Sequence, residues 1–173
     1  MSQILKAVNE PILSFTAGSP ERTSLQAKYD KMANQKIDIP LIIGGQEIRI
    51  GDTKNCIMPH DHQHILATFH NAGEAEVNQA IEAAMEAWKT WSVTPLQERT
   101  KIFRKAAELL QGPWRDTINA ATMLNQSKNA FQAEIDAACE LIDFFNFNAQ
   151  YAEEITAKQP LISPEGMHNH LEY

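Results

Sequence analysis

The sequence predicts an α+β fold, a helix-rich segment that carries a small antiparallel sheet. Between residues 37 and 70, short β-rich runs flank glycine or polar turns, a pattern typical of hairpins. From residue 71 to about 158, apolar residues recur at helical spacing. The chain therefore divides into an arm and helix at 1–36, a β region at 37–70, a helical region at 71–158, and a loop that leads into the start of a strand at 159–173.

Composition and charge exclude several classes of protein. The 173 residues suit one domain or a piece of one, and 43% hydrophobic with 21% charged residues is globular. The net charge of −7, without a Lys/Arg cluster, disfavours a nucleic-acid partner. The sequence contains no run of 18 apolar residues, so it predicts no membrane span. The first residues lack a signal-peptide or transit-peptide pattern. A cytoplasmic location is therefore expected.

Residues 1–20 contain prolines and no sustained period, so we expect an extended arm that packs onto other parts of the protein. Ser19 and Pro20 are typical of a helix start, with a serine N-cap and a proline in the first turn. The helix is expected to run to about Asn34.

The β region contains two predicted strand pairs. Gly44 and Gly45 lie between two β-rich runs and predict a tight hairpin turn. A second pair is predicted at 55–58 and 64–70, around the turn at 59–63.

The helical region is predicted to begin near residue 75, with a helix to Trp91. Thr94, Pro95 and Gln97 then match a capping box and predict a helix over 95–111. Its predicted buried residues are Ile102, Phe103, Ala106, Leu109 and Leu110. A further helix is expected from Pro113 to about Leu124.

The last predicted helix runs from about Asn129 to Thr156, and it carries an acid on its apolar side. Glu134 lies close in angle to Ala138 and Leu141 on a helical wheel. A buried carboxylate is costly without a partner. Glu134 is therefore either a structural residue paired with Arg or Lys, or a pocket residue that meets a cationic group of a ligand.

Other candidate groups are expected to be structural. His60, His62 and His64 alternate and could face one way, but a second ligand cluster that would close a zinc site is missing, so no metal is predicted. Cys139 lies among acidic residues, and Cys56 has Lys54 nearby but no clear base, so both are expected to be reduced, structural thiols. Lys128 is given no cofactor role.

Several stretches resemble one known family. These are NEPILSFTAGSPER at 9–22, IDIPLIIGG at 37–45, KAAELLQGPWRDTINAATML at 105–124 and FQAEIDAACELIDFFNFNAQYA at 131–152. They resemble the Δ1-pyrroline-5-carboxylate dehydrogenases of the aldehyde dehydrogenase superfamily. Family members are much longer, and this chain ends before the PFNF segment, the dinucleotide motif and the catalytic Glu and Cys. It therefore looks like an N-terminal segment of the enzyme, and no catalytic residue is expected in it.

The resemblance implies a fold and a function. The segment would be the N-terminal part of an aldehyde dehydrogenase α/β fold, packed on a Rossmann-type NAD domain that this chain lacks. The parent reaction would be NAD-dependent oxidation of L-glutamate γ-semialdehyde to L-glutamate in proline catabolism, by a homo-oligomer. Glu134 matches the Glu of the family's AEID motif, which meets the substrate α-ammonium. Phe131 and Phe145 would wall that pocket.

Two other functions remain open. The chain could be a non-catalytic helical interaction module that dimerises through exposed apolar faces. The same pattern could also belong to an aldehyde dehydrogenase with another substrate.

Overall fold

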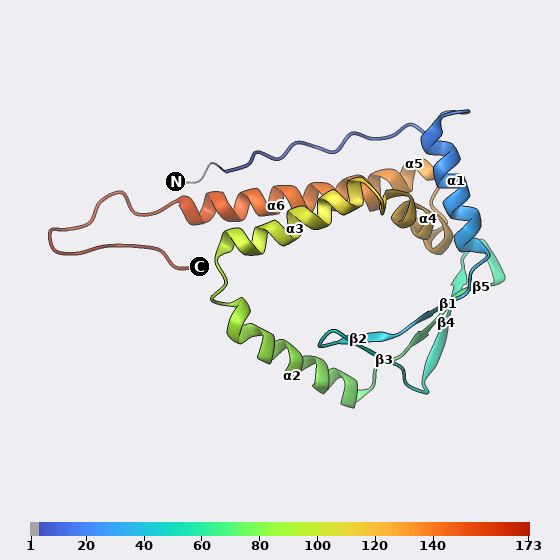
Figure 1. Ribbon diagram of the computed structural model, residues 1–173, viewed down its shortest axis with the longest axis horizontal. Coiled ribbons are helices and arrows are strands. Elements are labelled where there is room, and N and C mark those ends of the chain that lie inside the picture. The colour runs from blue at the N-terminus through green and yellow to red at the C-terminus, as the bar shows by residue number, and fades with distance from the viewer. Residues whose placement is uncertain (1–3) are drawn as a thin grey trace.

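The computed structural model describes residues 4–173 and arranges them as a helical layer and a β region that meet at one end (Figure 1). The helices α3 (Leu96–Gln111) and α6 (Glu140–Ala157) pack against each other. Helix α2 (Glu74–Trp91) lies apart from them and contacts the β region instead. The predicted helix-rich fold with small sheets is therefore confirmed.

The N-terminal arm runs extended along α6 and then enters α1 (Pro20–Ala33) (Figure 1). Hydrogen bonds fasten it, for example from Ala7 N to Gln150 Oε1 at 2.6 Å. The predicted packing of the arm is thus confirmed. Ser19 Oγ accepts from Arg22 N at 3.3 Å, which confirms the predicted cap of α1.

The β region contains five strands in two sheets. They are β1 (Ile37–Ile39), β2 (Leu41–Ile43), β3 (Gln46–Ile48), β4 (Thr53–Met58) and β5 (Asp61–His70). The antiparallel pairs β2–β3 and β4–β5 confirm the two predicted hairpins. Gly44 and Gly45 have φ of 56° and 78°, which glycine adopts without steric cost.

Strand β1 adds a parallel pairing that the sequence did not predict. It pairs with β5, with Ile37 opposite Ala67, and gives the sheet order β1-β5-β4. Such a pairing joins residues about thirty positions apart, so no local turn pattern marks it.

The predicted cap of α3 is wrong. This helix begins at Leu96, and its N-cap Pro95 has no side-chain cap bond. The Thr94 hydroxyl instead donates to Thr90 O at 2.8 Å, in the last turn of α2. Pro95 therefore occupies the cap position expected for Thr94, and a proline side chain has no acceptor with which to cap the helix.

The predicted burial along α3 is also largely wrong. Ile102, Phe103 and Leu109 are 57%, 43% and 39% exposed, and the buried positions are Thr100 and Ala107. The apolar stripe of α3 is wider than the surface of α6 that covers it.

The helix predicted from Pro113 to about Leu124 is α4 (Arg115–Gln126), and the long last helix has three parts. They are α5 (Ala130–Ala133), the π-helix η1 (Glu134–Cys139) and α6. Asn129 caps α5, because its side chain accepts from Gln132 N at 2.9 Å. Ser127, just after α4, has a left-handed φ of 56°.

Three small clusters form the core. They are Phe15, Leu25 and Ala120 between the arm, α1 and α4; Met58, Leu66 and Leu124 between β4, β5 and α4; and Ala107, Ala138 and Ile142 between α3, η1 and α6. Helix α4 joins the β region to the helical layer. Residues 158–173 form a loop, and the strand predicted at its end is not formed. Leu171 N instead donates to the side-chain oxygen of Gln159 at 2.8 Å.

Candidate functional site

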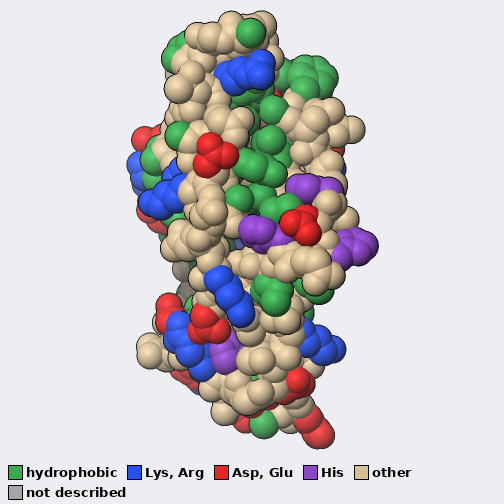
Figure 2. Space-filling model, turned by 90° about the vertical axis from the view of Figure 1, so that its right-hand side faces the viewer, with side chains coloured by type: hydrophobic (Ala, Val, Ile, Leu, Met, Phe, Trp, Pro, Cys, Tyr) green, Lys and Arg blue, Asp and Glu red, His purple; other side chains and the backbone are tan. Residues whose placement is uncertain are grey.

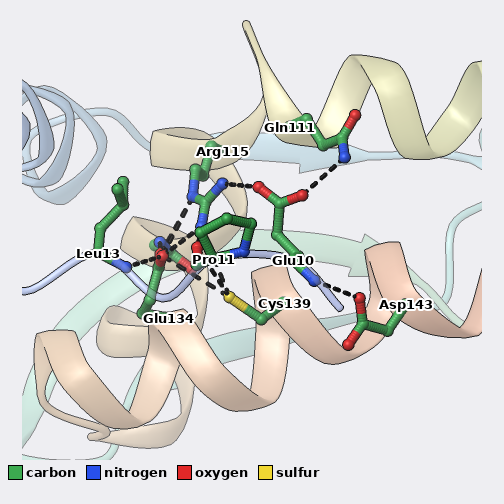
Figure 3. Close-up of polar contacts among 9 residues, drawn as sticks. Glu10, Pro11, Leu13, Gln111, Arg115, Glu134, Cys139 and Asp143 are labelled. Atoms are coloured by element: carbon green, nitrogen blue, oxygen red, sulfur yellow. Dashed lines mark hydrogen bonds and ion pairs between the residues drawn. The ribbon is translucent and has the colours of Figure 1, made fainter. Parts of the chain in front are cut away.

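The Glu134 side chain has no exposed surface and is surrounded by donors (Figure 3). Its Oε1 accepts from Leu13 N at 2.9 Å, and its Oε2 accepts from Asn119 Nδ2 at 2.7 Å. Arg115 donates through Nε at 3.2 Å and through Nη2 as well. The prediction that this carboxylate needs a cationic partner is confirmed, and the partner is an arginine.

Three elements bring these groups together. Arg115 and Asn119 are four residues apart in α4, so they lie on one face of that helix. Glu134 opens η1, and π-helical turns of this kind are frequent at functional sites. The arm supplies the Leu13 N–H from more than a hundred residues away.

Arg115 also holds a second carboxylate, that of Glu10 in the arm. Its Nη1 lies 2.5 Å from Glu10 Oε1, and its Nη2 donates to Pro11 O at 2.8 Å. Gln111 Nε2 donates to the other Glu10 oxygen at 2.6 Å, and Glu10 N donates to Asp143 at 2.7 Å. No sequence pattern singled out Glu10, Arg115 or Asn119, although each lies inside a stretch that carries the family resemblance.

The electrostatics of the cluster favour charged side chains. Burial raises the pKa of Glu134, but the bonds from Arg115, Leu13 and Asn119 outweigh it and hold that pKa below its ordinary value. Burial lowers the pKa of Arg115, but Glu134 and Glu10 raise it further, so the guanidinium stays charged. Two carboxylates on one guanidinium leave a net charge of −1.

Asn119 is the second polar residue of the cluster with no exposed surface. Its Nδ2 donates a hydrogen bond to Glu134 Oε2, whereas its Oδ1 is buried and has no hydrogen-bond partner among the described residues. Buried acceptors without a donor are uncommon and each calls for an explanation.

Cys139 lies beside the same carboxylate, with Sγ 3.7 Å from Glu134 Oε1. Burial and the Glu134 charge raise the pKa of this thiol to about 11. A thiol with so high a pKa is a poor nucleophile at neutral pH. This geometry agrees with the structural role expected for Cys139.

The structure does not bring the two predicted wall residues to Glu134. Phe131 is 56% exposed on α5. Phe145 packs against Phe103, with ring centroids 5.9 Å apart, and lines a groove of about 370 Å³ between α3 and α6 that Trp91 also lines. Contact of Phe131, Phe145 or Glu134 with a substrate stays a prediction.

Histidine side chains gather on the face drawn in Figure 2. The β4–β5 hairpin carries His60 in its turn and His62 and His64 in β5. His60 Nδ1 lies 2.8 Å from Ser127 Oγ, and His64 Nε2 lies 2.7 Å from Ala33 O. Within residues 4–173, no group of three or more His, Cys, Asp or Glu is placed to hold a metal ion. Lys128 pairs with Asp136 at 2.7 Å.

The turn before α2 does not fit the phosphates of a dinucleotide. The turn from β5 into α2 is a strand-to-helix turn, but it has only Gly73, whose N–H already donates to Glu76 at 2.8 Å. Glu74 and Glu76 in the first turn of α2 would repel a phosphate. Across residues 4–173, no helix is long and apolar enough to cross a membrane.

Comparison with known proteins places this geometry in a family. The model of the aldehyde dehydrogenase family matches residues 49–172. The chain is 47% identical to the mitochondrial delta-1-pyrroline-5-carboxylate dehydrogenase of Rattus norvegicus and 46% identical to that of Homo sapiens. These matches cover 98% and 92% of this chain, but 30% and 28% of the relatives.

Solved structures agree. The delta-pyrroline-5-carboxylate dehydrogenase of Mycobacterium tuberculosis bound with NAD superposes with a TM-score of 0.91 at 45% identity, over 95% of this chain and 31% of that one. The Thermus 1-pyrroline-5-carboxylate dehydrogenase with bound NAD gives 0.83 at 27% identity, over 95% and 32%. The chain thus spans about 30% of the length of these relatives. Since the family model matches well over half of its residues, the chain belongs to the aldehyde dehydrogenase family.

Proposed function

We propose that this chain is part of an NAD-dependent dehydrogenase that oxidises L-glutamate γ-semialdehyde to L-glutamate. The observation that carries the proposal is the 47% identity to a delta-1-pyrroline-5-carboxylate dehydrogenase over 98% of this chain. The fold agrees, with a TM-score of 0.91 against such an enzyme bound with NAD.

The Glu134 cluster supports the choice of substrate. L-Glutamate γ-semialdehyde carries an α-ammonium group, which distinguishes it from a simple aldehyde. Arg115 and its two carboxylates carry a net charge of −1, and Asn119 Oδ1 has no donor among the described residues. A cationic group would supply both the missing charge and the missing donor. We therefore keep Glu134 as the proposed partner of the substrate ammonium.

The cofactor and the chemical groups would come from outside residues 4–173. The N-terminus of α2 does not fit a phosphate, and we propose that NAD is bound elsewhere in the enzyme. Once bound, NAD would accept the hydride of the aldehyde. The role left to this chain is to shape the ammonium end of the substrate site and to pack against the rest of the enzyme.

Location and assembly are also proposals. The rat and human relatives are mitochondrial by name, whereas that of Agaricus bisporus carries no such term. We propose a cytoplasmic location here, which fractionation of the source cells would test. A homo-oligomer is proposed for the complete enzyme, which sedimentation would test.

One observation favours the alternative of an interaction module. Helix α2 has no buried residue and exposes Ile81, Met85 and Trp88 at 55–61%. In the proposed enzyme, the rest of the protein would cover the same face, so the exposed residues fit both functions. A measurement of dehydrogenase activity is therefore needed to distinguish the two.

The test is to express the complete reading frame that contains this chain and to follow NAD reduction. We expect turnover with L-glutamate γ-semialdehyde at a higher kcat/KM than with an aliphatic aldehyde of equal length. Turnover of the aliphatic aldehyde alone would assign another substrate, and no turnover of any aldehyde would favour the interaction module.

A further inference from the structure

We propose that Ser127 is a nucleophile activated by His60, at a second site where small carboxylic esters are hydrolysed. The site lies at the C-terminal end of α4 and shares no residue with the Glu134 cluster. Its activity is independent of aldehyde oxidation, so it goes beyond the proposed function.

The backbone of Ser127 is the first observation. Its φ of 56° and ψ of 26° lie in the left-handed region, which glycine adopts freely and serine does not. Backbone strain of this kind concentrates at functional sites. Ser127 is thus held in a conformation that costs free energy, and it lies on the surface, where a ligand can reach it.

The contact of the Ser127 hydroxyl with an imidazole is the second observation. Ser127 Oγ lies 2.8 Å from His60 Nδ1, and His60 Nε2 lies 3.5 Å from Tyr29 Oη. When the proton of the neutral ring is on Nε2, it faces the Tyr29 oxygen, and Nδ1 is the acceptor that faces Ser127. A serine within hydrogen-bond distance of such an acceptor has the arrangement of a nucleophile and its general base.

A cavity of about 320 Å³ beside the pair is the third observation. It is lined by Ser127, His60, Tyr29, Gln26, Met123 and Lys128. Ligand sites begin at roughly this volume, so the cavity suits a small molecule. The backbone N–H of Lys128 has no hydrogen-bond partner within residues 4–173. In hydrolases, the N–H of the residue after the nucleophile stabilises the oxyanion that forms on the carbonyl.

The reaction is an acyl transfer to Ser127 followed by hydrolysis. Ser127 Oγ forms a bond to the carbonyl carbon of the ester, and its proton moves to His60 Nδ1. The bond from that carbon to the alcohol oxygen breaks, and the alcohol leaves with the proton from His60. Water then attacks the acyl-serine with His60 again as the base, which releases a carboxylic acid and restores Ser127.

The experiment uses the complete enzyme and diisopropyl fluorophosphate, a reagent for activated serines. Ser127 Oγ would bond to phosphorus while the P–F bond breaks and fluoride leaves. Mass spectrometry of the peptides should find the adduct on Ser127 of the native wild type. His60→Gln should slow its formation by about 100-fold or more, because a general base contributes about 10²–10⁴-fold. The proposal is overturned if Ser127 carries no adduct, or if His60→Gln reacts as fast as wild type.

Ester turnover is the second measurement. Thiols are first alkylated with iodoacetamide so that no cysteine contributes, and release of 4-nitrophenol from 4-nitrophenyl acetate is then followed. Ser127→Gly should lower the rate by at least about tenfold. Because glycine relieves the backbone strain, this loss cannot come from unfolding.

Ser24→Ala is the matched control. Ser24 is also an exposed serine, but its hydroxyl donates to the Asp116 carboxylate and not to an imidazole. This variant should change neither the labelling of Ser127 nor the turnover of the ester. Equal ester turnover in wild type and Ser127→Gly would overturn the proposal and leave the Ser127–His60 contact as a structural link between α4 and the β4–β5 turn.

Discussion

At the scale of single residues, Glu134 shows what a pattern can and cannot reveal. Its position on an apolar helical face predicted a buried carboxylate with a cationic partner, and Arg115 is that partner. The identity of the partner could not be predicted, because it lies 19 residues away and depends on how α4 packs on η1. The Leu13 and Glu10 contacts span more than a hundred residues and leave no local pattern.

The buried pair predicts how stability depends on pH. The pKa of Glu134 is lowered on folding, so its ionised form stabilises the chain above the unfolded pKa, near 4.5. That contribution is lost as the pH falls through the lower, folded pKa. Urea unfolding of wild type should therefore show a free energy of unfolding that decreases below about pH 4.5.

Glu134→Gln should be less stable at neutral pH and should show a flatter acid limb. Arg115→Ala leaves the carboxylate buried and unpaired, so it should cost about 3–5 kcal/mol at neutral pH. If wild type and Glu134→Gln lose stability in parallel as the pH falls, Glu134 is not the group that titrates.

Ser127 offers a second test at this scale. Its φ of 56° is strained for serine, and its Oγ lies 2.8 Å from His60 Nδ1 on the surface. Ser127→Gly should stabilise the chain by about 0.5–1 kcal/mol, because relief of the backbone strain outweighs one exposed hydrogen bond.

Ser127→Ala is the matched control, since it removes the hydroxyl and keeps the strain. Thermal unfolding should rank glycine above serine and serine above alanine. An alanine variant as stable as the glycine variant would show that the backbone is not strained.

At the scale of elements, the hairpins were predictable and the π-helix was not. Gly44 and Gly45 mark their turn by residue type alone. The η1 segment contains no residue that breaks a helix, and its ladder shifts so that Glu140 N bonds to Ile135 O. A helical wheel with a fixed angle per residue cannot detect such a shift. A π-helical turn contains more residues than an α-helical turn, so residues on either side of it are not related by the angle that the wheel assumes.

The errors in α3 have a related cause. Thr94 matched a capping pattern, but the helix begins at Leu96, so Pro95 and not Thr94 occupies the N-cap position. Periodicity identified the apolar stripe of α3 correctly and could not tell which part of it a neighbour covers. The parallel pairing of β1 with β5 was missed because strands distant in sequence carry no turn pattern.

At the scale of the whole molecule, exposed apolar faces predict self-association of this chain. Ile81, Met85 and Trp88 form one stripe of α2, and each is more than half exposed. Sedimentation velocity should show oligomers whose fraction rises with concentration.

Trp88→Lys should shift that population towards monomer, whereas Lys89→Ala, on a charged position of the same helix, should not. A wild-type chain that stays strictly monomeric at every concentration would contradict the expectation that these faces need a cover.

The central claim is that the complete enzyme selects a semialdehyde through the ammonium that Glu134 binds. The measurement is kcat/KM of wild type and Glu134→Gln with L-glutamate γ-semialdehyde and with an aliphatic aldehyde of equal length. Glu134→Gln keeps the shape and removes the charge, so it should lower kcat/KM for the semialdehyde by about 10- to 100-fold and affect the aliphatic aldehyde far less. Equal losses for both aldehydes, or no loss for either, would contradict the claim and leave Glu134 as a structural partner of Arg115.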